Sequence, residues 1–210
     1  MSAGLPTTYP LQPATYVDCS QHIEDLAVAH RAKGALRRLM AAGPEATPAL
    51  RNGLRHADPA VRVGCCIVLD HYLDEAALPE LIANLDHENE DVRQWAMHAL
   101  ACDRCKEGAC RPGEDDVVPI ALRMLADDPS RRVRAQAVHL LGLSAAIRRQ
   151  DVTVALERAR ESDPDPNVRK IARKYAPGGA IYERTVSGRA AAPTAGARRP
   201  YRRKPRRALA

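Results

Sequence analysis

Apolar residues recur along the middle of the chain at the three- and four-residue spacing of amphipathic helices. In one stretch Val92, Ala96 and Leu100 fall on one helical face, and a later stretch from Val133 to Leu141 repeats this spacing. A similar amphipathic stretch precedes each of these two, and polar residues separate the stretches from one another. The pattern predicts a series of short amphipathic helices rather than strands.

Four short segments share one pattern that marks the start of a helix. Each contains a residue with a side-chain oxygen, two variable residues, a valine and an arginine; the segments are 58–62, 89–93, 130–134 and 165–169. The first residue can accept a hydrogen bond from a free N–H at a helix start. The valines are 31, 41 and 35 residues apart. With the amphipathic stretch ahead of each marker, the unit is a helical hairpin, and neighbouring hairpins stack to bury their apolar stripes.

These marker segments resemble the HEAT repeats, particularly the short bacterial type related to the phycobilin lyase repeats, over residues 46–176. The resemblance implies an all-α fold, a right-handed α-α superhelix in the form of a HEAT-like solenoid of about four helical hairpins. Residues 20–42 then form an N-terminal helical cap. The resemblance also implies that the second helices line a concave face, which binds a protein partner.

We expect three regions along the chain. Residues 1–19 form an extended N-terminal arm, residues 20–177 form the solenoid with a cysteine-bearing insert at 102–114, and residues 178–210 form a basic, disordered tail.

Enzymes of similar architecture provide a comparison. Deoxyhypusine hydroxylase needs several His-Glu pairs to hold two irons, whereas His87 and Glu88 form one such pair here. A HEAT-like DNA glycosylase would present aromatic residues and a carboxylate at a basic groove. Only Tyr72, Trp95 and Tyr175 are aromatic in the helical part, which is slightly acidic. Because a fold alone does not imply an activity, we expect a non-enzymatic protein.

Composition limits the environment of the chain. Hydrophobic residues make up 45% and charged residues 28% of the 210 residues, and there is no apolar run near the ~20 residues of a membrane-spanning helix. The first residues lack the pattern of a secretory signal, so we expect a cytoplasmic location. In a reducing compartment the six cysteines are more often thiols, metal ligands or redox groups than structural disulfides.

Three cysteines in the long interval between repeats form a candidate zinc site. Cys102, Cys105 and Cys110 can supply three thiolates of a tetrahedral site, and His98, four residues before Cys102, is the nearest fourth ligand. The alternatives are a reversible disulfide or redox pair, an iron-sulfur centre, or inert thiols. His139 occupies the place of His98 in the next repeat without such cysteines, so His98 is alternatively a plain helix-surface residue.

Other cysteines and aromatic residues have two interpretations. Cys65 and Cys66 lie in an almost wholly apolar helix and are expected in the core. Tyr72 and Trp95 are candidate interface residues, or alternatively large packing residues.

The arginine after each marker valine recurs in register along the repeats; the four residues are Arg62, Arg93, Arg134 and Arg169. They are either a ligand-binding row or, as we favour, structural residues that pair with an acid or a helix-end carbonyl of the neighbouring repeat.

The net charge of +6 is concentrated at the carboxyl end. Residues 178–210 hold nine of the 32 Lys and Arg residues and one of the 26 acids, so the rest of the chain has 23 bases and 25 acids. Such a tail can neutralise phosphates while its one ring stacks on a base, or it can simply be a solvated segment. The candidate residues for binding nucleic acid or an acidic partner are Arg198, Arg199, Tyr201, Arg202, Arg203, Lys204, Arg206 and Arg207.

Three functional hypotheses follow. The first is a protein-interaction scaffold with a structural zinc, the second is a nucleic-acid or ribonucleoprotein-associated factor that binds through the tail, and the third is a redox-active accessory that uses the insert cysteines.

The zinc hypothesis predicts the metal content of the protein. Protein purified without added metal should contain about one zinc per chain, measured by atomic emission, because three thiolates and an imidazole hold zinc tightly at neutral pH. Absence of metal together with three titratable thiols in the insert would contradict it.

Overall fold

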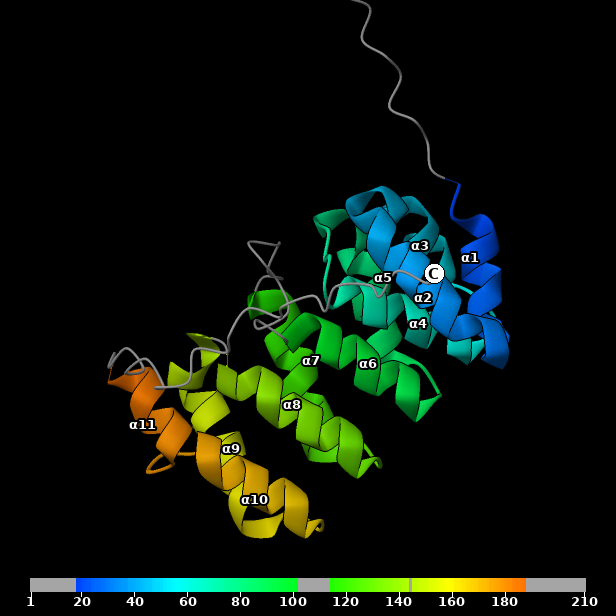
Figure 1. The fold of residues 1–210 in the computed structure, drawn as a ribbon. Helices are drawn as coiled ribbons and strands as arrows, with labels where there is room; N and C mark the ends of the chain where they lie inside the picture. Colours follow the sequence, from blue (N-terminus) through cyan, green and yellow to red (C-terminus); the bar gives the residue numbers. More distant parts are fainter. Residues whose placement is uncertain (1–17, 102–113, 144, 188–210) are drawn as a thin grey trace, which may run out of the picture. The chain divides into compact units, whose positions relative to one another are not determined.

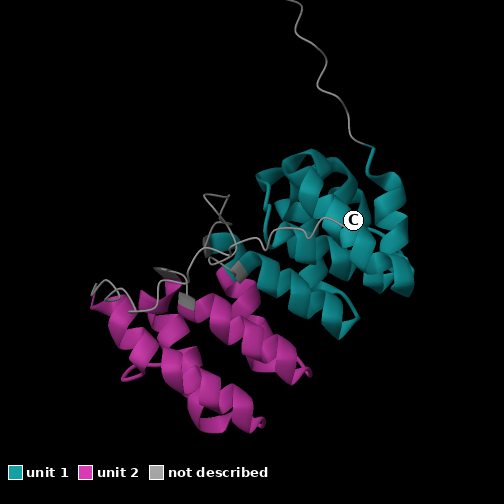
Figure 2. Cartoon of the chain, in the orientation of Figure 1, with its two compact units in different colours: residues 1–117 teal, residues 118–210 magenta. Residues whose placement is uncertain are grey.

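The fold is helical throughout the ranges that the computed structural model describes, which are residues 18–101, 114–143 and 145–187 (Figure 1). These ranges contain no strand, in agreement with the predicted all-α class. The chain divides into two compact units, residues 1–117 and 118–210 (Figure 2). No helix in the described ranges is long and apolar enough to span a membrane.

Unit 1 contains a helical cap and two hairpins, as the marker segments predicted. In the cap, α1 packs against both helices of the first hairpin and α2 packs against its second helix, α4, which in turn packs against α6. The elements of unit 1 are α1 (Ser20–Glu24), η1 (Asp25–Ala27), α2 (Ala29–Ala42), η2 (Gly43–Ala46), α3 (Thr47–Gly53), α4 (Pro59–Leu69), η3 (Glu75–Ala77), α5 (Leu78–Ala83), η4 (Asn84–Asp86) and α6 (Glu90–Ala101).

Unit 2 begins within α7 and contains the later helices. Helix α10 is its most connected element, since it packs against α8, α9 and α11. The elements are α7 (Glu114–Asp127), α8 (Arg131–Leu143), η5 (Ala145–Arg148), α9 (Gln150–Ser162), α10 (Pro166–Tyr175) and α11 (Ala180–Val186).

Side-chain caps confirm three of the predicted helix starts. Asp58 Oδ1 accepts from the Ala60 N–H at 2.8 Å, and Asp165 Oδ1 accepts from Asn167 N–H at 2.8 Å. At the start of α6, Asn89 Oδ1 accepts from the backbone N–H of Asp91 at 2.9 Å. These bonds satisfy donors that have no partner within the first helical turn.

The residue two positions before each cap residue also takes part in the helix start, because its side chain accepts a hydrogen bond from the backbone of the cap residue. His56 and His87 accept the cap residue's N–H through Nδ1 at 2.9 and 3.0 Å, while Asp128 and Asp163 do so through Oδ1 at 2.8 Å. Burial lowers the pKa of His87, which favours the neutral imidazole that can accept at Nδ1. Each turn therefore has a second side-chain acceptor, which the sequence analysis did not identify.

Each marker arginine donates to the carbonyl six residues earlier, within the turn of its own hairpin. The bonds run from Arg62 to His56 O at 2.6 Å, from Arg93 to His87 O at 2.9 Å, from Arg134 to Asp128 O at 2.9 Å and from Arg169 to Asp163 O at 2.6 Å. The structural interpretation is confirmed, but the carbonyls belong to the same repeat rather than to its neighbour. An arginine in the first helical turn reaches back over the turn that leads into its helix, and this makes the contact local.

Two marker arginines also reach the following first helix. Arg62 Nη1 donates to Asn84 Oδ1 at 2.9 Å in unit 1. In unit 2, Arg134 makes a two-pronged ion pair with Asp163, from Nε at 2.8 Å and from Nη2 at 3.0 Å. Asn84 is buried and also donates to Leu54 O at 2.9 Å and Glu80 O at 2.8 Å. The arginines thereby set the register between consecutive hairpins.

The buried interior of the described residues consists mainly of Leu, Val, Ile, Ala and Met side chains. Cys65 and Cys66 are fully buried in α4, which confirms their predicted place in the core. Burial raises the pKa of Cys65 to about 12. Cys19 is also buried at the start of α1, where desolvation raises the pKa of its thiol. These three thiols are packing groups rather than activated nucleophiles.

The helical part of the chain continues beyond residue 177, where we expected the tail to begin. Gly178 has a φ of 78°, and a Cβ at Gly179 would collide with the carbonyl oxygens of Arg173 and Lys174. The two glycines thus let the chain turn back closely on α10, so that α11 packs against it. Arg148 Nη2 donates to the Thr185 carbonyl of α11 at 3.1 Å.

The buried ion pair predicts a large stability difference between two arginine variants. Arg134→Met should lower the free energy of unfolding by about 3 kcal/mol, because it leaves the buried Asp163 carboxylate without its cation. Arg131→Met removes a side chain that is 64% exposed and pairs with Asp165 at 3.4 Å, so it should change stability little. Urea denaturation measures both, and equal effects would contradict the role of Arg134.

Candidate functional site

An open groove lies between α7 and α9 of unit 2. Its volume is about 510 Å³. Leu122, Leu125 and Ala126 of α7 line it together with Val154 and Ala155 of α9. Val154 is 55% exposed, which is unusual for a large aliphatic residue of this chain. We call these five residues the α7–α9 groove.

Charged residues surround the apolar part of the α7–α9 groove. Asp127, Asp151 and Arg158 lie among its lining residues, as does the buried pair of Arg134 and Asp163. Arg149 holds Asp151 through a 2.8 Å ion pair and lowers the pKa of its carboxyl. The groove therefore combines an apolar centre with a polar edge, as protein-binding surfaces do.

Unit 1 has a smaller hollow at the equivalent place between α3 and α5. Its volume is about 270 Å³, and its lining includes Arg62 and its partner Asn84. Arg51 donates from Nη2 to Glu80 at 2.9 Å, and Arg55 also pairs with this buried carboxylate. The hydrogen bonds from Arg51 lower the pKa of Glu80. This ion cluster joins α3 and the turn that follows it to α5.

The predicted zinc ligands are only partly within the described residues. Cys102, Cys105 and Cys110 lie outside them, so the zinc site stays a prediction. His98 of α6 has its Nε2 3.5 Å from Asp70 Oδ2, and its ring meets the Trp95 ring edge-on at 5.3 Å between centroids. Among the described residues, no three metal-ligating side chains gather at one point.

The equivalent histidine of unit 2 has a similar helix-to-helix contact. His139 Nδ1 lies 2.9 Å from the Tyr175 hydroxyl, and the two rings meet edge-on at 5.4 Å. Gly142 leaves the room for this ring, since a Cβ there would overlap Tyr175. Both histidines therefore have a structural partner, whether or not His98 also binds a metal.

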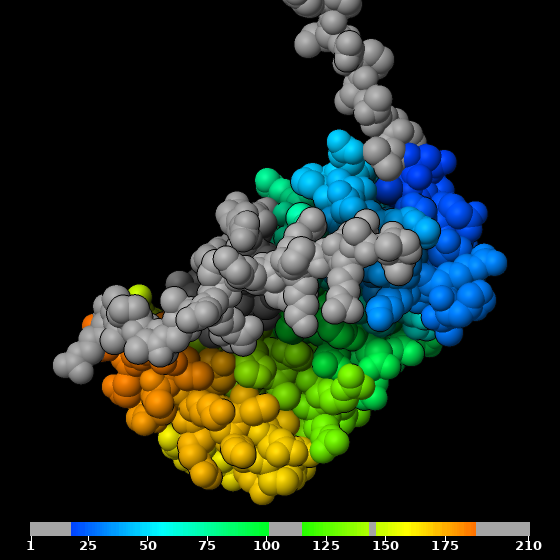
Figure 3. Space-filling view, in the orientation of Figure 1, coloured from blue at the N-terminus to red at the C-terminus, as the bar shows by residue number. Residues whose placement is uncertain are grey.

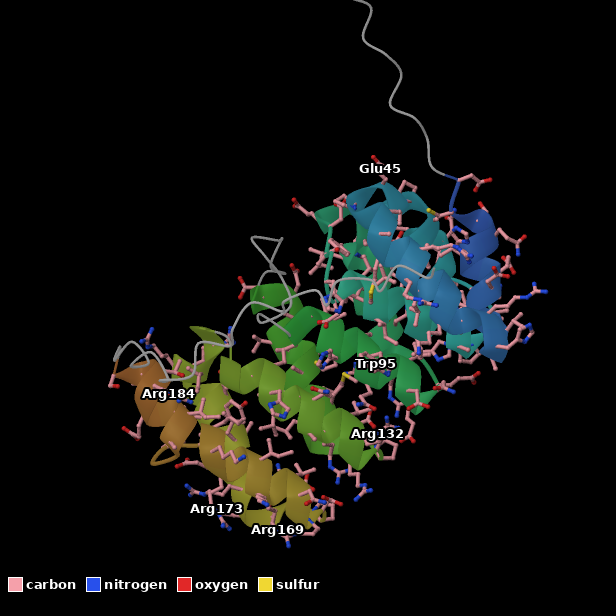
Figure 4. The ribbon with its side chains drawn as sticks, viewed as in Figure 1. Glu45, Trp95, Arg132, Arg169, Arg173 and Arg184 are labelled. Atoms are coloured by element: carbon pink, nitrogen blue, oxygen red, sulfur yellow. The ribbon has the colours of Figure 1, made fainter. Side chains whose placement is uncertain are left out.

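The two candidate interface aromatics lie apart in the sequence and share no ring contact. Tyr72 follows α4 and is 39% exposed, and its ring is tilted by 47° against the ring of His71, with centroids 6.4 Å apart. Trp95 is half-buried on α6 (Figure 4). Their role at an interface stays a prediction, as does that of the tail residues 198–207, which lie outside the described ranges.

The sequence analysis missed two features that the structure makes clear. Val154 interrupts the amphipathic pattern of α9, because it lies on the opposite side from the buried Val152 and Leu156. The charges also divide at the unit boundary: residues 1–117 hold 11 bases and 18 acids, whereas residues 118–210 hold 21 bases and 8 acids. Both features can be seen in the sequence, but a net charge taken over residues 1–177 as a whole hides the division at residue 117.

Comparison with known proteins identifies the repeats. Residues 21–101 match the family model of HEAT repeats. No curated protein and no solved structure matches the chain. The match does not single out the phycobilin lyase type, so that closer resemblance stays a prediction. HEAT repeats generally serve as scaffolds for protein interactions. The marker segments, the stacked hairpins and this match together identify residues 21–101 as HEAT repeats.

Proposed function

We propose that this protein is a non-enzymatic scaffold that binds a protein segment in the α7–α9 groove. The exposed Val154 in an open apolar groove is the observation that carries the proposal. Exposed large aliphatic side chains that gather in a concave surface favour a partner's apolar side chain. The occupant is a segment that inserts one large apolar residue between the two helices.

The polar edge of the groove supports a protein partner rather than a small metabolite. Arg158 is exposed and its guanidinium makes no bond with any described residue, and Asp127 is exposed at the other helix. A segment with an acid and a base beside its apolar residue complements these two charges. Such rim charges give orientation and specificity more than affinity.

The chemistry of the groove supports a role without catalysis. Its described lining contains no histidine and no cysteine. Arg134 and Asp163 neutralise one another, and the Ser162 hydroxyl donates to Arg158 O at 2.9 Å. These groups are engaged in holding the repeat together, so no general base stands beside a nucleophile there.

Three predicted sites complement this proposal. The second helices of unit 1, with Trp95 on α6 and Tyr72 after α4, form a second candidate protein interface. The Arg-rich tail is the candidate element for nucleic acid, and the cysteine insert is the candidate zinc site.

A peptide selection tests the α7–α9 groove. Random peptides displayed on phage and selected on the immobilised full-length chain should converge on sequences with a large apolar residue. Val154→Asp should weaken their binding by about tenfold or more, because a charge replaces the apolar contact at the centre of the groove. Fluorescence polarisation with a labelled selected peptide measures this affinity.

Gln150→Glu is the matched control, because it adds the same charge to an exposed position of α9 outside the groove lining. It should leave peptide binding unchanged. Failure to enrich any sequence, or equal weakening by both variants, would contradict the groove as a docking site.

A further inference from the structure

Helix α10 presents a solvent side whose charged groups are all cations. Its ten residues include Arg169, Lys170, Arg173 and Lys174 and no acid. The opposite side of the helix is buried through Val168, Ala172 and Tyr175. Lys170, Arg173 and Lys174 are exposed, and Figure 4 shows Arg173 extending away from the ribbon.

Three of these cations have no partner among the described residues. Arg169 donates to the carbonyls of Asp163 and Pro164, so it belongs to the turn. Lys170, Arg173 and Lys174 make neither a hydrogen bond nor an ion pair within the described part of the chain. An uncompensated group of like charges costs stability through repulsion, which a bound polyanion would relieve.

The acids nearest to these cations in the sequence have other partners. Asp163 pairs with Arg134, and Asp165 caps α10 and pairs with Arg131. Glu161 pairs with Arg160, and Glu183 accepts from the Gly178 N–H at 3.0 Å. These carboxylates therefore do not neutralise the solvent side of α10.

Helix α11 adds a further cation beside α10. Arg184 is exposed on α11, which packs against α10 (Figures 1 and 4). The space-filling view shows part of the α10 and α11 surface in yellow to orange (Figure 3). Residues 188–210 follow directly in the sequence with eight more bases and no acid. We call Lys170, Arg173, Lys174 and Arg184 the α10 patch.

Helix α10 lacks the groups by which protein partners bind tightly. The exposed large hydrophobic residues of the described chain are Tyr72, Val154 and Val186, and none of them lies on α10. Protein interfaces need an apolar or aromatic centre, whereas phosphates need only well-placed cations. Tyr175 is buried, so α10 also offers no ring on which an unpaired base could stack.

We propose that the α10 patch binds the phosphate backbone of a nucleic-acid duplex without reading its sequence. The cations lie on one helix and its neighbour, where they can meet successive phosphates along a groove edge. Each neutralised phosphate releases a condensed counterion, so the affinity falls steeply with salt. This surface is separate from the α7–α9 groove, and either proposal can fail without the other.

The test uses the full-length chain and a fluorescein-labelled DNA duplex of about 20 base pairs. Lys170→Gln/Arg173→Gln/Lys174→Gln should weaken binding by about tenfold and reduce the slope of log affinity against log salt by about 2 to 3. These substitutions keep good helix formers on an exposed surface. Circular dichroism and the midpoint of thermal unfolding verify that the variant folds.

Helix α2 provides a control of equal charge. Lys33→Gln/Arg37→Gln/Arg38→Gln removes three exposed cations from unit 1 and changes the net charge by the same amount. It should leave affinity and salt slope close to those of the unaltered chain. Equal weakening by the two triple variants would overturn the proposal, because binding would then depend on total charge or on residues 188–210 alone.

A labelled poly-glutamate of the same charge as the duplex distinguishes an acidic polypeptide. It should bind more weakly than the duplex, and the α10 variant should lose duplex affinity selectively. If poly-glutamate binds as tightly as the duplex and the α10 variant loses affinity for both ligands equally, the patch is a general site for acidic chains and the duplex proposal is wrong.

Discussion

The bond from each marker arginine to its own interhelical turn is the interaction on which the repeats depend. It joins the start of the second helix to a carbonyl six residues earlier, while the cap residue and the acceptor two places before it satisfy the exposed N–H groups. Because these polar groups are satisfied within one turn, the helices can expose their apolar stripes to one another. Arg134 then extends the same network to Asp163 of the next hairpin.

The partner that the marker arginine contacts in the following hairpin differs between the units: Asn84 lies eight positions before the next marker valine, whereas Asp163 lies five before it. Asn84 in unit 1 is neutral and binds Arg62 and two backbone carbonyls, while Asp163 in unit 2 is a charged partner of Arg134. Around Asn84, the Glu80 ion cluster lies beside the smaller hollow of unit 1. Around Asp163, the ion pair is buried and aliphatic residues such as Val154 remain open to solvent.

Unit 2 thus presents two surfaces with different chemistry. The α7–α9 groove has an apolar centre and a mixed polar edge, which favours a protein segment. The α10 patch has unpaired cations without an apolar centre, which favours phosphates. Both surfaces follow from the packing of unit 2, in which α7 and α9 leave the groove open and the described residues leave the solvent side of α10 uncovered. A scaffold built this way can hold a protein and a polyanion at separate places.

The sequence by itself determined the helical repeats, their starts and their buried residues. Caps such as Asp58 and the apolar positions of α4 are encoded within a few neighbouring residues, where local hydrogen bonds and helical spacing decide the outcome. The packing of the helices decides that Val154 borders an open groove, that Asp163 neutralises Arg134, and that Lys170 and Arg173 have no counter-ion among the described residues. These properties depend on which helices pack side by side, and neither the spacing along the chain nor its summed charge contains that information.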